Sequence, residues 1–436
     1  MKTWPLLVLG LIATAAPAMA ARPLIDIEGA AFRPFPVAIP EFKAKASAHA
    51  AQAREVAEVL RNDLALTGLF QVLDPRSFIA SPEREGVTVG TISFPSWLNV
   101  GADGLVKALL DKTGDTLQVE VHVFDVVRAR ETMKKRFKGG VDQPRRLAHR
   151  IADALIEHYT GEKGLFLSRI AFTQRSGRGK NICSMDVDGY NVICHVKNGT
   201  INMLPAWQGR GALLFTTYIK GNPDVYRVGL GDGALTPIST WPGLNSGAAA
   251  SPDGKRIALT LSRDGNSEIY IVDSAGKNPR RLTNQPWSID SSPAWSPDGK
   301  RIAFVSDRTG NPQIYVMGSD GSGARRLTFQ GNYNQTPAWS PRGDRIAFTA
   351  RDERNVFDIF TVDVASGQIE RVTQDQGNNE EPTWSPNGRM LAFISSRQGV
   401  KAIFVADAKG SNQRRVSRGE EARYTPSWSG LMPDLK

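Results

Sequence analysis

The chain has 436 residues, and its 54 Lys and Arg against 44 Asp and Glu leave a formal charge of +10. Its 41% apolar and 22% charged residues are typical of a globular protein, which excludes a wholly disordered chain and a polytopic membrane protein. The length predicts two or three domains. Basic and acidic residues are interspersed, so we expect no nucleic-acid partner.

Residues 1–20 have the three parts of a secretory signal peptide. Lys2 supplies a positive start, an apolar stretch follows over 6–16, and Ala18-Met19-Ala20 fits the small-x-small cleavage pattern. A retained hydrophobic N-terminus is the alternative. No later segment is long enough to span a bilayer, so we expect the mature chain outside the inner membrane, without direct membrane insertion.

Helix and strand patterns together predict a small α/β domain over 21–162. A helix is expected over 43–67, because its apolar residues recur on one face, and Gly68 suits a C-terminal cap. Three strands are expected over 104–112, 116–127 and 131–138.

A second helix is predicted over 143–160, with Asp142 as its N-terminal cap and Gly161 at its end. His149 and His158 lie on this helix and are expected at the protein surface. The five histidines of the chain show no metal-ligand spacing, and Asp186-Val187-Asp188-Gly189 lacks the rest of a calcium loop, so we predict no metal site and no cofactor. A cation in the central channel of the repeat region is the alternative.

From residue 200 onward the sequence repeats itself. The phrase PAWSPDGKRIAF at 293–304 returns as PAWSPRGDRIAF at 337–348 and PTWSPNGRMLAF at 382–393, with weaker copies earlier in the chain. Each unit holds four short apolar runs separated by turn residues, which is typical of a β-propeller blade. The equivalent positions, 43 to 45 residues apart and expected to pack between blades, are Trp207, Ala250, Trp295, Trp339, Trp384 and Trp428.

The two ends of the repeat region complement each other. The last fragment, PSWS at 426–429, supplies only an inner strand, whereas 169–173 and 182–186 match the second and third strands of a blade. We therefore expect the C-terminal strand to close a ring of six blades, which leaves no free sheet edge. The predicted fold is an α/β N-terminal domain and an all-β six-bladed propeller over 163–430, with a tail over 431–436.

Cys183 and Cys194 are the only cysteines, and they flank the turn signal Asp188-Gly189. A two-residue turn there would place the cysteines opposite each other on paired strands, at a separation compatible with a disulfide. Two reduced, half-buried thiols are the alternative.

The sequence contains no G-x-S-x-G, P-loop or H-E-x-x-H motif, so no catalytic residues are predicted. One rival hypothesis is the propeller of a prolyl-oligopeptidase-like peptidase, which would require a following hydrolase domain. Another is a carbohydrate-binding propeller, which would need exposed aromatic side chains, whereas the tryptophans here are expected at repeat positions.

The chain as a whole resembles the TolB family of the Tol–Pal envelope system. The resemblance rests on the signal peptide, PLIDIEGAAFRPFPVAIPEF at 23–42, VAEVLRNDLALTGLFQVLD at 56–74, SWLNVGADGLVKA at 96–108 and the six repeats. It implies a periplasmic, non-enzymatic and monomeric adaptor that supports outer-membrane integrity and cell division.

The resemblance also implies two protein partners. One is the inner-membrane protein TolA, expected to contact an extended segment made of Leu24, Ile25, Asp26, Ile27 and Glu28. A strand paired within its own domain is the alternative for this segment.

The second implied partner is Pal, a peptidoglycan-associated lipoprotein, expected to bind one mouth of the ring. The loops that enter the inner strands are rich in polar and aromatic residues, which suit a specific wet interface, although ordinary turn composition is the alternative. The predicted rim residues are Leu244, Asn245, Asp290, Ser291, Tyr333, Asn334, Gln335, Asn379, Glu380, Arg423 and Tyr424.

Overall fold

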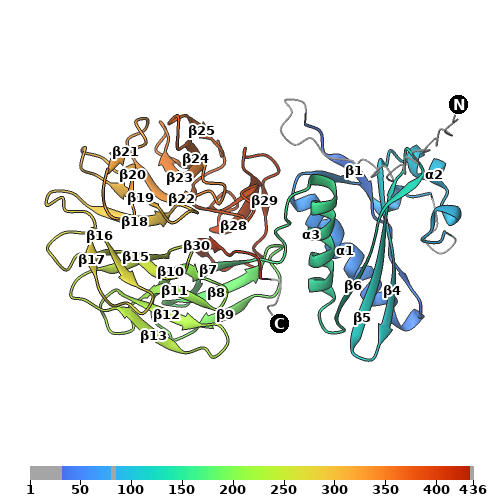
Figure 1. Cartoon of the computed structure of the whole chain (residues 1–436), viewed down its shortest axis with the longest axis horizontal. Coiled ribbons are helices and arrows are strands. Elements are labelled where there is room, and N and C mark those ends of the chain that lie inside the picture. Colours follow the sequence, from blue (N-terminus) through green and yellow to red (C-terminus); the bar gives the residue numbers. More distant parts are fainter. Residues whose placement is uncertain (1–31, 80–84, 433–436) are drawn as a thin grey trace, which may run out of the picture.

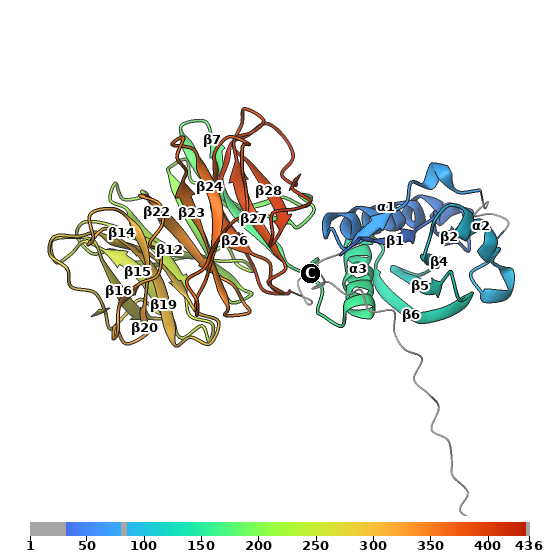
Figure 2. The same ribbon diagram turned by 90° about the horizontal axis from the view of Figure 1, so that it is seen from above.

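The computed structural model describes residues 32–79 and 85–432. It contains an α/β domain and a β-propeller that lie side by side (Figures 1 and 2). The predicted signal peptide and the segment from Leu24 to Glu28 lie outside the described residues. Within the described ranges, no helix is both long and apolar enough to cross a bilayer.

The α/β domain is a mixed sheet covered by two helices. The sheet has the strand order β3-β1-β4-β5-β6, in which β1 runs parallel to its neighbours and β4, β5 and β6 form an antiparallel meander. The two long helices cover one face of this sheet, and α3 lies between the sheet and the propeller, so α3 has two faces to bury (Figures 1 and 2). The elements are β1 (Phe35–Ala38), β2 (Lys43–Ala44), α1 (Ala50–Leu66), β3 (Phe70–Val72), α2 (Phe94–Asn99), β4 (Gly104–Thr113), β5 (Thr116–Asp125), β6 (Arg130–Gly140) and α3 (Pro144–Thr160).

Both long helices begin later than the sequence predicted. Residues 43–44 pair with β4 as a short strand and 47–49 form a 3₁₀ turn, so α1 starts at Ala50. The cap of α3 is Gln143, so the prediction of Asp142 was wrong; Pro144 at the first helical position sets the entry instead. Gly161 ends α3 in a left-handed conformation with φ of +74°.

Residues 169–428 form six four-stranded antiparallel sheets. The first three are β10 (Asn202–Gln208), β11 (Ala212–Thr217), β12 (Asp224–Gly229) and β13 (Leu235–Ser239); β14 (Asn245–Ala250), β15 (Arg256–Leu261), β16 (Glu268–Asp273) and β17 (Arg280–Arg281); and β18 (Asp290–Trp295), β19 (Arg301–Ser306), β20 (Gln313–Gly318) and β21 (Arg325–Arg326). The fourth and fifth are β22 (Asn334–Trp339), β23 (Arg345–Arg351), β24 (Phe357–Asp363) and β25 (Ile369–Arg371); and β26 (Asn379–Trp384), β27 (Met390–Ser395), β28 (Ala402–Asp407) and β29 (Arg414–Arg415).

The sixth sheet contains both ends of the propeller. Its order is β30 (Arg423–Trp428), β7 (Arg169–Ser176), β8 (Gly179–Asp186) and β9 (Ile193–Val196). Arg423 pairs with Gln174 and Trp428 with Ile170, so the last strand is the inner strand of the first blade. The predicted six-bladed ring, closed by the C-terminal strand, is confirmed.

The repeat tryptophans connect successive blades. The indole Nε1 of Trp295 donates to the carbonyl of Ala249 at 3.0 Å, and Trp384 does the same to Ala338 at 3.0 Å. Each acceptor lies on the inner strand of the preceding blade, so the indole packs between sheets while its polar atom remains bonded. In the closing blade, Trp428 at the end of β30 donates to Ser168 Oγ, just before β7, at 2.8 Å.

Each inner strand has a bulge where the pairing register shifts. The residue at the bulge has a positive φ in all six strands. In five of them this residue is not glycine. The six bulge residues line a central cavity of about 280 Å³. They are Leu204, Gly247, Ser292, Thr336, Glu381 and Thr425.

The closing strand generates a stability prediction. Trp428→Ala should lower the free energy of unfolding by about 3 to 4 kcal/mol, because a buried indole and its hydrogen bond are lost at the ring junction. Urea unfolding followed by circular dichroism measures this change. Trp287→Ala is the control, since that side chain is 97% exposed and its loss should change stability little. Equal effects of the two substitutions would contradict this role for the closing strand.

Candidate partner-binding surfaces

The antiparallel blades give the propeller two different mouths. At one mouth lie the turns from the inner to the second strand and from the third to the outer strand. At the other mouth lie the turns from the second to the third strand and the loops from each outer strand to the next inner strand. Every contact with the α/β domain described below falls on the first mouth. Arg342 and Arg389 in the inner turns bind Glu162, and Asn412 before β29 donates to the carbonyl of Leu66. At the second mouth, where the inner strands begin, no hydrogen bond or ion pair joins the propeller to the α/β domain within residues 32–79 and 85–432. We call it the free mouth.

The predicted rim residues all lie at this free mouth, but they fall into two groups. Five are the first residues of inner strands and are buried, whereas the other six are half-buried. The buried group is Asn245, Asp290, Asn334, Asn379 and Arg423; the half-buried group is Leu244, Ser291, Tyr333, Gln335, Glu380 and Tyr424.

The buried group holds the loops in place. Asn379 Nδ2 donates to Asp358 Oδ1 at 2.9 Å, and the same oxygen accepts from Thr373 Oγ1 at 2.7 Å, which ties the third strand of one blade to the inner strand of the next. Asn334 makes the equivalent bond to Gln313 Oε1 at 2.7 Å. A partner resting on the mouth would touch the half-buried group, not these side chains.

Exposed aromatic and aliphatic side chains occupy the same mouth, and the sequence analysis missed them. We call Trp241, Trp287, Ile289 and Phe329 the aromatic rim; their exposed fractions are 36%, 97%, 54% and 72%. They lie on the loops β13–β14, β17–β18 and β21–β22, so they cover one side of the mouth. The expectation that the tryptophans occupy repeat positions is wrong for Trp241 and Trp287, and their place outside the repeat was the signal that could have revealed them.

Arginines frame these aromatic side chains. The guanidinium of Arg263 lies 4.0 Å from the ring centroid of Trp241, that of Arg326 lies 5.1 Å from Phe329, and that of Arg351 lies 4.6 Å from Tyr333. At these distances each guanidinium makes a cation–π contact with its ring. The free mouth therefore combines exposed apolar side chains with arginines, of which Arg263 is also paired with Asp264.

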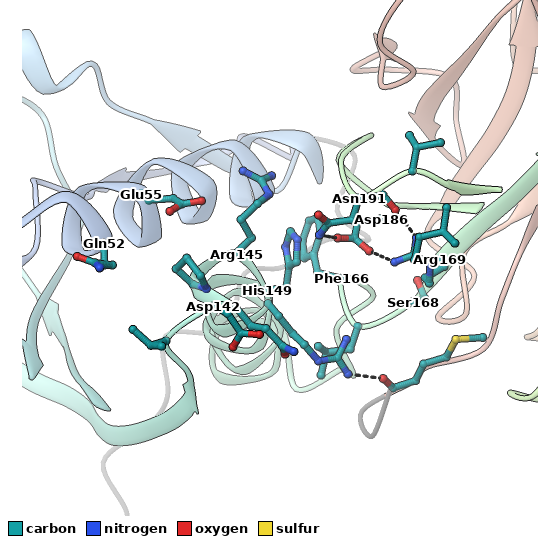
Figure 3. Close-up of a pocket in the computed structure, with 18 residues that line it drawn as sticks. Gln52, Glu55, Asp142, Arg145, His149, Phe166, Ser168, Arg169, Asp186 and Asn191 are labelled. Carbon is teal, nitrogen blue, oxygen red and sulfur yellow. Dashed lines mark hydrogen bonds and ion pairs between the residues drawn. The ribbon is translucent and has the colours of Figure 1, made fainter. Parts of the chain in front are cut away.

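The opposite mouth forms a junction with the α/β domain that is rich in buried charge. A cavity of about 720 Å³ lies there, and Arg145, His149 and Asp186 are among its lining residues (Figure 3). His149 is only 3% exposed, and His158 is 9% exposed and within 3.1 Å of Thr132 Oγ1. The prediction that both histidines lie on the surface was wrong, because α3 is covered on both sides.

His149 connects the two domains. Its Nδ1 lies 2.7 Å from Asp63 Oδ2 on α1, and its Nε2 lies 3.9 Å from Asp188 Oδ2 in the loop after β8. Burial opposes the charged imidazole, but the carboxylates of Asp63 and Asp188 outweigh it and raise the pKa of His149 to about 9. Arg145 also forms an ion pair with Asp188.

Residues 156–432 match the family described as "TolB beta propeller domain", and residues 23–132 match "TolB amino-terminal domain". The "Tol-Pal system protein TolB" of Anaeromyxobacter dehalogenans (strain 2CP-C) is 48% identical over 424 residues, which cover 96% of each chain. This chain belongs to the TolB family. Its relative of the same name in Myxococcus xanthus (strain DK1622) is 45% identical over 415 residues, covering 95% of this chain and 96% of that one.

The TolB family fold is also seen in a solved structure. The crystal structure of TolB from Acinetobacter baumannii matches with a TM-score of 0.80 at 23% identity, covering 91% of this chain and 97% of that chain. The family's propeller match begins at residue 156, inside α3.

The cysteine pair of this TolB-family chain lies on β8 and β9. Cys183 is paired with Cys194 in the strand register, and the structure joins them in a disulfide. The expected two-residue turn is instead a six-residue loop over 187–192, in which Gly189 donates to Asp186 O and Asn191 has a positive φ. The strand register nevertheless places Cys183 opposite Cys194, as the shorter turn would have done.

The disulfide leads to a second prediction. Replacing both Cys183 and Cys194 by Ser should lower the free energy of unfolding by about 2 kcal/mol, since the cross-link limits the unfolded chain. Urea unfolding with and without a reductant measures this: the parent chain should lose stability when reduced, and the double variant should not respond. A parent chain that is indifferent to reductant would argue for free thiols.

Proposed function

We propose that this chain is a non-enzymatic periplasmic adaptor of the Tol–Pal system. It would bind a Pal-like outer-membrane lipoprotein through the free mouth of the propeller and a TolA-like inner-membrane protein through residues 24–28. In this role it would support outer-membrane integrity and cell division. The family membership and the name of its relatives support the general role.

The observation that carries the lipoprotein site is the aromatic rim. Trp287 and Phe329 expose large apolar surfaces on a mouth that the α/β domain leaves uncovered. Exposed apolar side chains that cluster on one face mark an interaction surface, and tryptophan anchors supply much of the binding energy at such surfaces. The half-buried side chains Tyr333, Gln335 and Glu380 lie at the same mouth and can add polar contacts at its edge.

The charges around the rim indicate the chemistry of the partner surface. Arg263 and Arg326 stack on Trp241 and Phe329 of the aromatic rim, and Arg351 stacks on Tyr333 at the same mouth. A partner with carboxylates beside an apolar patch would match this surface. No catalytic step is assigned to this mouth, and the proposed role requires none.

The lipoprotein proposal predicts a loss of binding on substitution of the rim. Trp287→Ala with Phe329→Ala should weaken binding of the soluble domain of a peptidoglycan-associated lipoprotein from the same organism about 30-fold, because two exposed anchors are removed. Isothermal titration calorimetry measures the affinity, and urea unfolding checks that stability is kept. Val127→Ala, an exposed apolar residue of the α/β domain, is the matched control. Unchanged affinity in the double variant would reject the aromatic rim as the binding site.

The TolA proposal predicts that the two partner sites separate. Deleting residues 21–28 should abolish capture of a TolA-like protein, because the segment expected to add to its sheet is gone, while capture of the lipoprotein is kept. Pull-down of both partners from envelope extract measures this. The unmodified mature chain is the control, and equal loss of both partners would defeat the two-site hypothesis.

A further inference from the structure

We propose that Asp63, His149 and Asp188 form a binding site for a divalent transition-metal ion, which connects the α/β domain to the propeller. The site does not depend on the proposed adaptor function. The ligand atoms of the three side chains all lie within 4.8 Å of one another, and all three side chains are buried.

The imidazole of His149 is oriented in the way that metal-binding histidines are. Its Nδ1 is engaged by Asp63 Oδ2 at 2.7 Å, and its Nε2 has no hydrogen-bond partner among the described residues. A carboxylate on one ring nitrogen fixes the ring and leaves the other nitrogen to bind the metal. Nε2 lies 3.9 Å from Asp188 Oδ2, so an ion near 2.1 Å from each atom would fit between them after only a small adjustment.

His122 shows what a satisfied buried histidine looks like in the same chain. Its Nδ1 lies 2.5 Å from Glu131 Oε1 and its Nε2 lies 3.1 Å from Glu120 Oε1, so both nitrogens already have carboxylate partners. At His149 one nitrogen is left over, and Asp63 Oδ1 is also buried without a hydrogen-bond partner within the described part of the chain. Unpartnered buried polar atoms are costly, and a bound ion satisfies them.

The local charge balance favours a divalent ion. Three carboxylates, those of the buried Asp63 and Asp188 and of the half-buried Asp153, interact with this imidazole or with one another, and the guanidinium of Arg145 pairs with only one of them. A divalent cation on a neutral imidazole would offset the remaining two charges. Carboxylate and imidazole ligands suit zinc and its first-row neighbours.

The neighbouring cavity supplies access and the remaining ligands. His149 and Arg145 both line the cavity of about 720 Å³ at the junction (Figure 3). Water in this cavity can complete a four-coordinate ion that has few protein ligands. Arg145 is the internal competitor, because its guanidinium binds the Asp188 oxygen that the metal would use.

Isothermal titration calorimetry with zinc chloride tests the site. The sample is the mature chain without a histidine tag, freed of metal by a chelator. We expect one zinc ion per chain, loss of that binding in His149→Gln, and retention in the matched control His122→Gln. Asp63→Asn should weaken binding 10- to 100-fold, as removal of an orienting partner does. Arg145→Gln should strengthen zinc binding, because the competing guanidinium is removed. If the three side chains were only an ion-pair network, this substitution would not increase the affinity for zinc.

Two outcomes would overturn the proposal. One is no zinc binding by the parent chain, and the other is equal binding by the parent and by folded His149→Gln, which would mean an adventitious site. If His149→Gln does not unfold cooperatively, Asp188→Asn replaces it, and cobalt is used as a second probe. The visible absorption of bound cobalt reports nitrogen and oxygen ligands, and it should be present in the parent and absent in Asp188→Asn.

Discussion

Pairing of β30 with β7 is the constraint on which the rest of the molecule depends. This contact joins residues more than 240 positions apart, and it turns a row of similar sheets into a ring with two distinct mouths. The same strand reaches the domain junction, where Trp428 bonds Ser168 and the carbonyl of Met432 accepts from Arg146 on α3. Ring closure and domain contact therefore share one segment of chain, so a disturbance of either will affect the other.

The sequence was sufficient to predict the propeller because each blade is a local unit whose turns and strands recur at a fixed period. The repeat phrase marked the inner strands, and the orphan strands at 169–173 and 182–186 marked the closing blade. Local signals were less accurate at the helix starts: Asp142 looks like a cap, but the chain enters α3 through Gln143 and Pro144. Several conformations compete at such positions, and tertiary packing decides among them.

The candidate sites were harder to predict because they depend on which surfaces remain uncovered. Asn245, Asn334 and Asn379 look like exposed turn residues, yet each is buried and bonds to the preceding blade. His149 seemed to lie on the outer face of an amphipathic helix, but a second domain covers that face. A single helix pattern shows one buried stripe and cannot show the contact that a later part of the chain will make.

The bulge in every inner strand has a consequence for how the two ends of that strand are used. An unbroken strand alternates strictly, so one face would show every second residue from the first to the last. In β18 the extra residue Ser292 shifts the phase: Asp290, Pro293 and Trp295 are buried, and the alternation restarts halfway. One strand can thus point its first residue into the wall of the mouth and its last residue between two blades. Deleting one residue at the bulge would restore strict alternation along the strand. The first residue of the strand and the tryptophan at its end could then no longer both be buried.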